Sequence, residues 1–173
     1  MSSDLGILLL RVLFGVPMAA HGAQKLFGWF GGYGLKGTGG FFEGLGFRPG
    51  TTFAALAGLS EMGGGILLTL GLLTPVGASA VLAAMLVAIF SVHIKNGFFA
   101  MGNGIEMPFL YAAVALGLMF SGAGSLSLDS VLGLTFLNQP YVVGGSLALA
   151  IIGAGATLGL RKQSAPQASA AHR

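Results

Sequence analysis

Long apolar segments alternate with short polar segments along this chain. A membrane-spanning helix needs about 20 mostly apolar residues, and five segments have about that length. Strands are not expected, because runs such as 78–92 are apolar throughout and lack the alternation of a membrane barrel. The predicted spans are Leu5–Ala23, Thr51–Leu73, Pro75–Ile94, Met107–Gly124 and Tyr141–Leu160. The pattern therefore predicts an all-α fold, a polytopic helical bundle in a membrane.

The segments between the spans differ in character. Residues 24–50 are rich in glycine and aromatic residues and contain no long apolar run, so we expect an interfacial or re-entrant loop folded over one mouth of the bundle. Residues 125–160 comprise a connecting loop and the fifth helix. Residues 161–173 are small and polar with basic ends, and we expect a disordered tail there.

The composition narrows the function classes. Charged residues make up 8% of the chain, against about 25% in a soluble domain. With no cysteine, thiolate-bound iron–sulfur clusters, zinc–thiolate sites and disulfides are excluded. The basic residues are scattered rather than grouped on one face, which argues against nucleic-acid binding. One short glycine motif, residues 32–37, lacks the strand that a nicotinamide or flavin dinucleotide fold requires before it.

The distribution of lysine and arginine predicts an orientation. Five spans place seven of these residues on one side and none in the loops of the other side, and cytoplasmic loops are the ones that carry basic residues. We therefore expect the N-terminus outside and the C-terminus inside. The seven residues are Lys25, Lys36, Arg48, Lys95, Arg161, Lys162 and Arg173.

Two charged residues lie within the predicted spans. Glu61 is near the middle of the second span, where an unpaired carboxylate would cost at least about 2.5 kcal/mol. Arg11, in the first span, is its expected partner, with an axial offset of roughly 9 Å. Such a pair either fixes the helix register or forms a proton or ligand site, and we leave both interpretations open.

Further ionisable residues gather at the basic side. His21, Lys25, His93 and Glu106 all lie near that mouth, beneath the aromatic loop that contains Trp29. A polar cluster on an apolar floor is the usual form of a small-molecule pocket. We predict that His21 and Glu61 act in proton transfer to a quinone head group. Arg11, Lys25, His93, Glu106 and Trp29 are the predicted ligand contacts.

Metal and haem sites have weaker support. His21 and His93 are the only pair that could hold a haem, and both are near helix ends, so a haem is not expected. No metal site is assigned. Small residues mark packing faces instead: Gly58 and Gly65 belong to a stripe on the second span, and Gly155 and Gly159 to the fifth. We expect bundle packing at both faces, and the second also permits a homo-oligomer.

Three segments resemble the DoxX family of small bacterial membrane proteins. They are HGAQKLFGWFGG at 21–32, FFEGLGF at 41–47 and EMGGGILLTLGLLTPVGA at 61–78, with NGFF at 96–99 in support. The resemblance covers roughly residues 5–120. It implies a four-helix membrane core, here residues 1–124, in a bacterial inner membrane, with the fifth helix as an addition. It also implies an oxidoreductase linked to quinone-reducing complexes or redox-defence assemblies, and it supplies no catalytic residues.

Three functions from different classes remain open at this point. The first is a quinone-linked oxidoreductase or a membrane subunit of one, in which a partner protein supplies the electrons. The second is a scaffold that anchors soluble redox enzymes through the loop containing Lys36 and Arg48. The third is a small proton-coupled transporter with Glu61 as its proton site, against which stands the lack of matched inverted halves.

Overall fold

The structure is a computed structural model and describes residues 2–162. Within this range it consists of helices and their connections, without a β-strand, as the sequence predicts. The principal helices are α1 (Ser2–Phe27), α2 (Gly34–Gly44), α3 (Gly50–Leu70), α4 (Thr74–Ala88), α5 (Glu106–Ser121), α6 (Leu128–Val131) and α7 (Pro140–Gly159). Short helical turns are η1 (Trp29–Gly31), η2 (Ile89–His93), η3 (Ile94–Asn96), η4 (Ala100–Gly102) and η5 (Thr135–Asn138).

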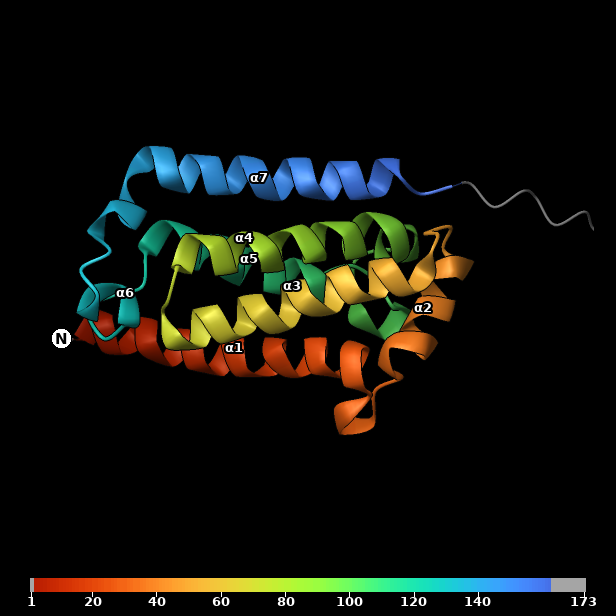
Figure 1. The fold of residues 1–173 in the computed structure, drawn as a ribbon, viewed down its shortest axis with the longest axis horizontal. Helices are drawn as coiled ribbons and strands as arrows, with labels where there is room; N and C mark the ends of the chain where they lie inside the picture. Colours follow the sequence, from red (N-terminus) through yellow and green to blue (C-terminus); the bar gives the residue numbers. More distant parts are fainter. Residues whose placement is uncertain (1, 163–173) are drawn as a thin grey trace, which may run out of the picture.

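The helices α1, α3, α4, α5 and α7 run alternately up and down in one elongated bundle (Figure 1). We call the end that contains α2, the end of α1 and the end of α7 the α2 end. The α6 end contains the start of α1, the α3–α4 turn and α6. Six of the seven basic residues expected to share one side belong to segments at the α2 end. The seventh, Arg173, lies outside the described residues.

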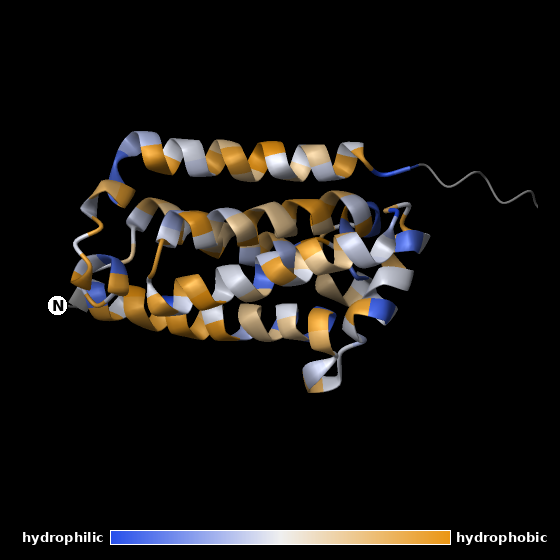
Figure 2. Cartoon of the chain, viewed as in Figure 1, coloured by the Kyte–Doolittle hydropathy of each residue, from blue (hydrophilic) through white to orange (hydrophobic). Residues whose placement is uncertain are grey.

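In the part of the chain that the structure describes, four helices are long and apolar enough to cross a membrane: Ser3–Phe27, Gly50–Leu70, Thr74–Asn96 and Pro140–Gly159. Figure 2 shows hydrophobic residues along these helices and most of the hydrophilic ones near the two ends. The predicted fourth span is shorter than expected. Its helix, α5, has 16 residues, or roughly 24 Å, against a hydrocarbon core of about 30 Å. It stops at Gly122, whose φ of 73° cannot continue a right-handed helix.

Glycine contacts hold α1 against α3. A Cβ atom added at Gly22 would lie 2.5 Å from the carbonyl oxygen of Gly58, and one at Gly15 would lie 2.6 Å from that of Gly65. No larger residue fits, so the two backbones touch directly at these levels. The packing stripe predicted for the second span is therefore confirmed. The helix α1 runs through Pro17 as one element.

Our prediction that Gly155 and Gly159 form a packing face within the bundle is wrong. No atom lies within 4 Å of a Cβ added at Gly155 or Gly159, and both residues are exposed. The helix α7 instead packs on α4 through Val143, Ala150 and Ala154. A helix that touches one neighbour has room for only one buried face, which is why the glycine face points outward.

The glycine–aromatic segment is more ordered than a loop. Between α1 and α3 it forms η1 and α2, and α2 packs on the start of α3 where Gly39 meets Gly50. Glycine disfavours helices by about 1 kcal/mol per residue, so the tertiary contact decides the conformation here. The predicted disordered tail begins with two docked residues, Arg161 and Lys162, which hydrogen-bond to Leu45 and Gly46. Its remainder, 163–173, lies outside the described residues.

Candidate functional site

The buried carboxylate of Glu61 is paired with Lys25 rather than with Arg11. Lys25 lies in the last turn of α1, and its Nζ donates a hydrogen bond to Oε2 of Glu61 on α3. Glu61 is 5% exposed, whereas the side chain of Lys25 retains 27% exposure. The glycine contacts between α1 and α3 bring these helices close enough for this ion pair. Our predicted Arg11–Glu61 pair is therefore wrong.

Arg11 belongs to a different polar cluster at the α6 end. It is 1% exposed and donates from Nη2 to the carbonyl oxygen of Leu126. The negative charge that acts on it is the carboxylate of Asp129 on α6, with which it forms no ion pair. Sequence reasoning placed Arg11 beside Glu61 because it compared only depths along the helices, and it did not consider the loop between α5 and α7 as a source of a buried acid.

Asp129 is a buried residue that the sequence analysis missed. Its carboxylate accepts hydrogen bonds from the backbone N of Leu73 at 2.7 Å, and from the N and Oγ1 of Thr74 at 3.0 and 2.8 Å. It therefore caps the start of α4. The motif that could have indicated it is Ser127–Leu128–Asp129, where Ser127 accepts from the backbone N of Ser130 and begins α6.

A cavity of about 460 Å³ lies beside the Lys25–Glu61 pair. Its walls come from α2, α3, α4 and α7, and most of them are apolar. The polar lining residues are Lys25, Ser60, Glu61, Ser91, His93, Asn103 and Thr157. The apolar lining residues are Phe41, Phe42, Phe47, Phe53, Leu56, Ala57, Ala83, Ala84, Val87, Ala88, Val92, Gly153 and Ala154. A few polar groups in an apolar cleft of this size suit a small organic ligand.

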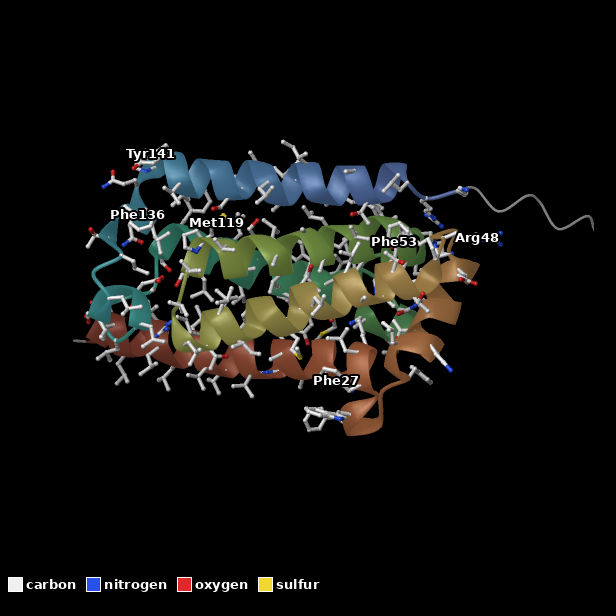
Figure 3. All side chains as sticks on the ribbon, viewed as in Figure 1. Phe27, Arg48, Phe53, Met119, Phe136 and Tyr141 are labelled. Atoms are coloured by element: carbon white, nitrogen blue, oxygen red, sulfur yellow. The ribbon has the colours of Figure 1, made fainter. Side chains whose placement is uncertain are left out.

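Four phenylalanines form one wall of the cavity. The ring centroids of Phe41 and Phe42 are 5.9 Å apart, those of Phe42 and Phe47 6.0 Å, and those of Phe47 and Phe53 5.2 Å. Figure 3 labels Phe53 near the α2 end of the bundle. Tilted rings at this spacing are the favoured aromatic contact, so the wall is a continuous aromatic surface. From the sequence, Phe41, Phe42 and Phe47 were noticed as part of a family motif and not as a wall of the site, and Phe53 was not singled out.

The π-helical segment η2 carries the polar groups of the opposite wall. It continues α4 from Ile89 to His93, and π-helical turns within α-helices are frequent at functional sites. His93 Nδ1 is 2.8 Å from the carbonyl oxygen of Asn103. A backbone carbonyl can only accept, so Nδ1 carries the proton and Nε2 remains an acceptor while the ring is neutral.

Three of the seven predicted site residues line the cavity: Lys25, Glu61 and His93. The other four lie elsewhere. His21 contacts Gln24 and the ring of Tyr111, and Glu106 accepts from the backbone N of Ala100 at 2.7 Å.

Trp29 and Arg11 are the other two predicted site residues that do not line the cavity. Trp29 is 59% exposed and stacks against Phe27, which projects from the end of α1 (Figure 3). Arg11 is at the α6 end, as described above. Helical spacing told us that His21, Lys25 and Trp29 share one end of the bundle, but it could not tell which of them faces inward. Among residues 2–162, no cluster of three His, Asp or Glu side chains could hold a metal ion.

Comparison with known proteins now identifies the class. The family model named DoxX matches residues 6–94, which contain both members of the Lys25–Glu61 pair. The chain belongs to the DoxX family.

Two relatives give the range of similarity. A Bacillus subtilis protein named "Putative oxidoreductase CatD" is 32% identical over 128 residues, which cover 74% of this chain and 87% of that protein. An uncharacterized protein of Haemophilus influenzae is 41% identical over 78 residues, which cover 43% of this chain and 58% of that protein. The matched part thus spans little more than half of the Haemophilus protein. No solved structure matches the chain significantly. The family model ends before α5, so α5, α6 and α7 lie outside it.

Proposed function

We propose that this DoxX-family protein is the membrane component of an oxidoreductase and binds the ring of a quinone in the cavity beside Lys25 and Glu61. One observation carries the proposal: a hydrogen-bonded acid–base pair at the inner edge of an apolar cavity walled by four phenylalanines. The name of the Bacillus relative, which covers most of its length, supports the reaction class.

The cavity fits the chemistry of a quinone. A quinone takes up two electrons and two protons to become a quinol, and the electrons would come from a partner redox protein. The aromatic wall of Phe41, Phe42, Phe47 and Phe53 suits a flat ring. Lys25 Nζ has hydrogens beyond the one it donates to Glu61, so it can also donate to a ring oxygen.

Glu61 and His93 would handle the protons. Glu61 exchanges a proton with Lys25 through their hydrogen bond, and a carboxylate relieved of its partner can hold the second proton. On the other side of the cavity, Nε2 of His93 can accept a hydrogen bond from the hydroxyl of the quinol product while Nδ1 bonds the carbonyl oxygen of Asn103. His21, Glu106 and Trp29, which do not line the cavity, are not part of this proposal.

Purified protein in detergent tests it with a short-tailed quinone such as decylubiquinone. We expect Glu61→Gln and Lys25→Met each to weaken binding by about tenfold or more, since each removes a charged hydrogen-bonding group. Glu106→Gln and Lys36→Met are matched controls at the same end of the molecule, and affinity should stay within about twofold. Wild-type protein that binds no quinone, or controls that lose as much affinity as the cavity variants, would refute the proposal.

We also propose the orientation N-terminus outside and C-terminus inside, in a bacterial inner membrane. The basic residues at the α2 end support it, and the cavity, which lies toward that end, would then be in the cytoplasmic half of the membrane. Reporter fusions at each terminus test the orientation. A periplasmic reporter active at the C-terminus would contradict it.

The scaffold function has its own support. The α2 end exposes large apolar side chains, among them Phe30 at 72%, Tyr33 at 86% and Met101 at 100% exposure, next to exposed Lys36 and Arg48. Such residues suit contact with a partner protein. Neutralising Lys36 and Arg48 together should reduce recovery of a bound redox protein, while Glu61→Gln should not. Equal recovery from both variants would count against a scaffold.

The transporter hypothesis gains no support. Between Arg11 and the Lys25–Glu61 pair, the buried core is an apolar cluster that includes Phe14, Met18, Leu68 and Leu82. A proton path along the bundle needs a chain of polar groups, and this cluster consists of apolar side chains.

A further inference from the structure

The cavity continues into a slot between α3 and α7. The helix α7 has α4 as its main packing partner, and α3 packs on α1, α2 and α4. The space left between α3 and α7 is lined by Leu56 and Ala57 on one side and by Gly153 and Ala154 on the other, with alanines of α4 at its base. The helix α7 lies outside the part of the chain that the DoxX model matches, so the slot has one wall inside that part and one wall outside it.

The slot opens at a depth where lipid chains lie. Leu56 is six residues into α3 and Gly153 is six residues before the end of α7, so both are about 9 Å from their helix ends. Leu56 is 53% exposed, and no atom lies within 4 Å of a Cβ added at Gly153. Thr157 Oγ1 donates to the carbonyl oxygen of Gly153 at 2.8 Å, so its hydroxyl hydrogen is already used within α7. The two edges of the slot, at Leu56 and Gly153, are therefore apolar and uncovered.

The polar groups of Lys25 and Glu61 lie further inside the bundle than these two edges of the slot. Glu61 is 11 residues into α3, about 16 Å from its start, and it faces Lys25 of α1 on the far side of the cavity from α7. A ligand that reaches Glu61 from the slot would therefore have its polar ring inside and its apolar remainder in the slot. This polarity matches an amphiphile that enters sideways from the bilayer.

Two hydrogen bonds join the segment after α7 to the opposite wall of the cavity at the α2 end. Arg161 Nε donates to the carbonyl oxygen of Leu45, and the backbone N of Lys162 donates to that of Gly46 at 2.9 Å. The guanidinium of Arg161 also lies 5.9 Å from the ring centroid of Phe47. These contacts join the end of α7 to the turn that carries the aromatic wall, so they set the distance between the two sides of the slot.

We propose that the slot between α3 and α7 binds the hydrocarbon chain of a ring-headed amphiphile that enters the cavity from the lipid. This inference rests on the proposed function for the identity of the ring. It adds that chain length contributes to affinity and that α7, rather than the helices matched by the DoxX model, provides the selectivity.

Two variants on α7 test the slot. Gly153→Phe would fill it, and Gly155→Phe is the matched control, because Gly155 also has open space around it but does not line the cavity. The probes are decylubiquinone and the same dimethoxy-methyl-benzoquinone ring without a chain. We expect Gly153→Phe to weaken decylubiquinone binding by about tenfold and to leave the tailless ring within about twofold. Gly155→Phe should change neither by more than about twofold.

The outcomes separate the two proposals. If Gly153→Phe leaves decylubiquinone binding unchanged, or weakens both compounds equally, the slot proposal is overturned while the ring site stands. If the wild type binds neither compound, the proposed function fails. The slot is then judged with a phospholipid whose acyl chain carries a photoreactive group. Crosslinking to wild type and to Gly155→Phe, with loss in Gly153→Phe, assigns the slot to a lipid chain, whereas equal crosslinking to all three overturns it.

Discussion

Each end of the bundle places a basic residue near a buried acidic one, but the two ends use these charges differently. At the α6 end, the carboxylate of Asp129 accepts three hydrogen bonds from Leu73 and Thr74, and Arg11 bonds the loop carbonyl of Leu126. At the α2 end, Lys25 and Glu61 bond each other and both line a cavity. The first cluster joins the α3–α4 turn and helix α1 to the segment between α5 and α7, while the second lies at a large cavity, where Lys25 can also bond a ligand.

The two charged residues inside the predicted spans, Arg11 and Glu61, do not have the same role. An ionisable residue within a span is by default a functional candidate, and by that rule Arg11 and Glu61 are equal candidates. The contacts separate them, because Arg11 is 1% exposed and lines no part of the large cavity. We therefore expect variants at the α6 end to change stability and variants at the α2 end to change binding.

The largest effect is expected from Asp129→Ala. It removes the cap of α4 and leaves the buried Arg11 without its acidic neighbour, which should lower the free energy of unfolding by about 3–5 kcal/mol. Thermal denaturation in detergent measures the loss. The folded fraction should bind quinone as the wild type does, and a stable variant with impaired binding would reverse our assignment of the two ends.

Gly71→Ala should destabilise the same end by a smaller amount. Gly71 has a φ of +61°, and a Cβ there would lie 1.7 Å from Nη1 of Arg11. Strain and displacement of the guanidinium together should cost about 2–3 kcal/mol. Gly63→Ala is the control, because Gly63 lies inside α3 with open space around it, and a better helix former there should not destabilise the protein. Equal denaturation temperatures for the two variants would contradict the close contact.

Glu61→Gln should weaken quinone binding strongly and lower stability only slightly, which is the reverse of the effect expected from Asp129→Ala. Because Lys25 retains some exposure, its ammonium group can move toward water, so the loss of stability should be about 1 kcal/mol or less. Denaturation of this variant beside Asp129→Ala measures the difference directly. A loss as large as that of Asp129→Ala would mean that the Lys25–Glu61 pair is primarily structural.

The smallest effect is expected from Trp29→Phe. The side chain of Trp29 is exposed on η1 and stacks on Phe27, away from the cavity. Quinone affinity and stability should both stay within the error of measurement. A clear loss of affinity would show that η1 folds over the cavity when a ligand is bound.

Some parts of the site could be predicted from the sequence. Glu61 and Lys25 stood out because charges are costly near apolar spans, and the side of the bundle shared by Lys25 and His93 followed from counting spans. The aromatic wall and Asn103 were not predicted as a site, since glycine-rich segments do not reveal how they fold. Asp129 was overlooked because the Ser127–Leu128–Asp129 motif indicates only the start of a short helix and not the turn at Leu73–Thr74 that the carboxylate caps.

Apolar length and the scarcity of charge determined the membrane class and the helical fold, because a bilayer leaves the backbone few other ways to satisfy its hydrogen bonds. The glycines of α3 likewise determined a close helix contact. Only the tertiary structure decided which helix α3 touches at each level, and hence that Glu61 meets Lys25 and not Arg11. Pairing depends on helix rotation and on the path of loops such as 122–139. Neither is fixed by hydrophobicity, because lipid accepts any apolar face equally well.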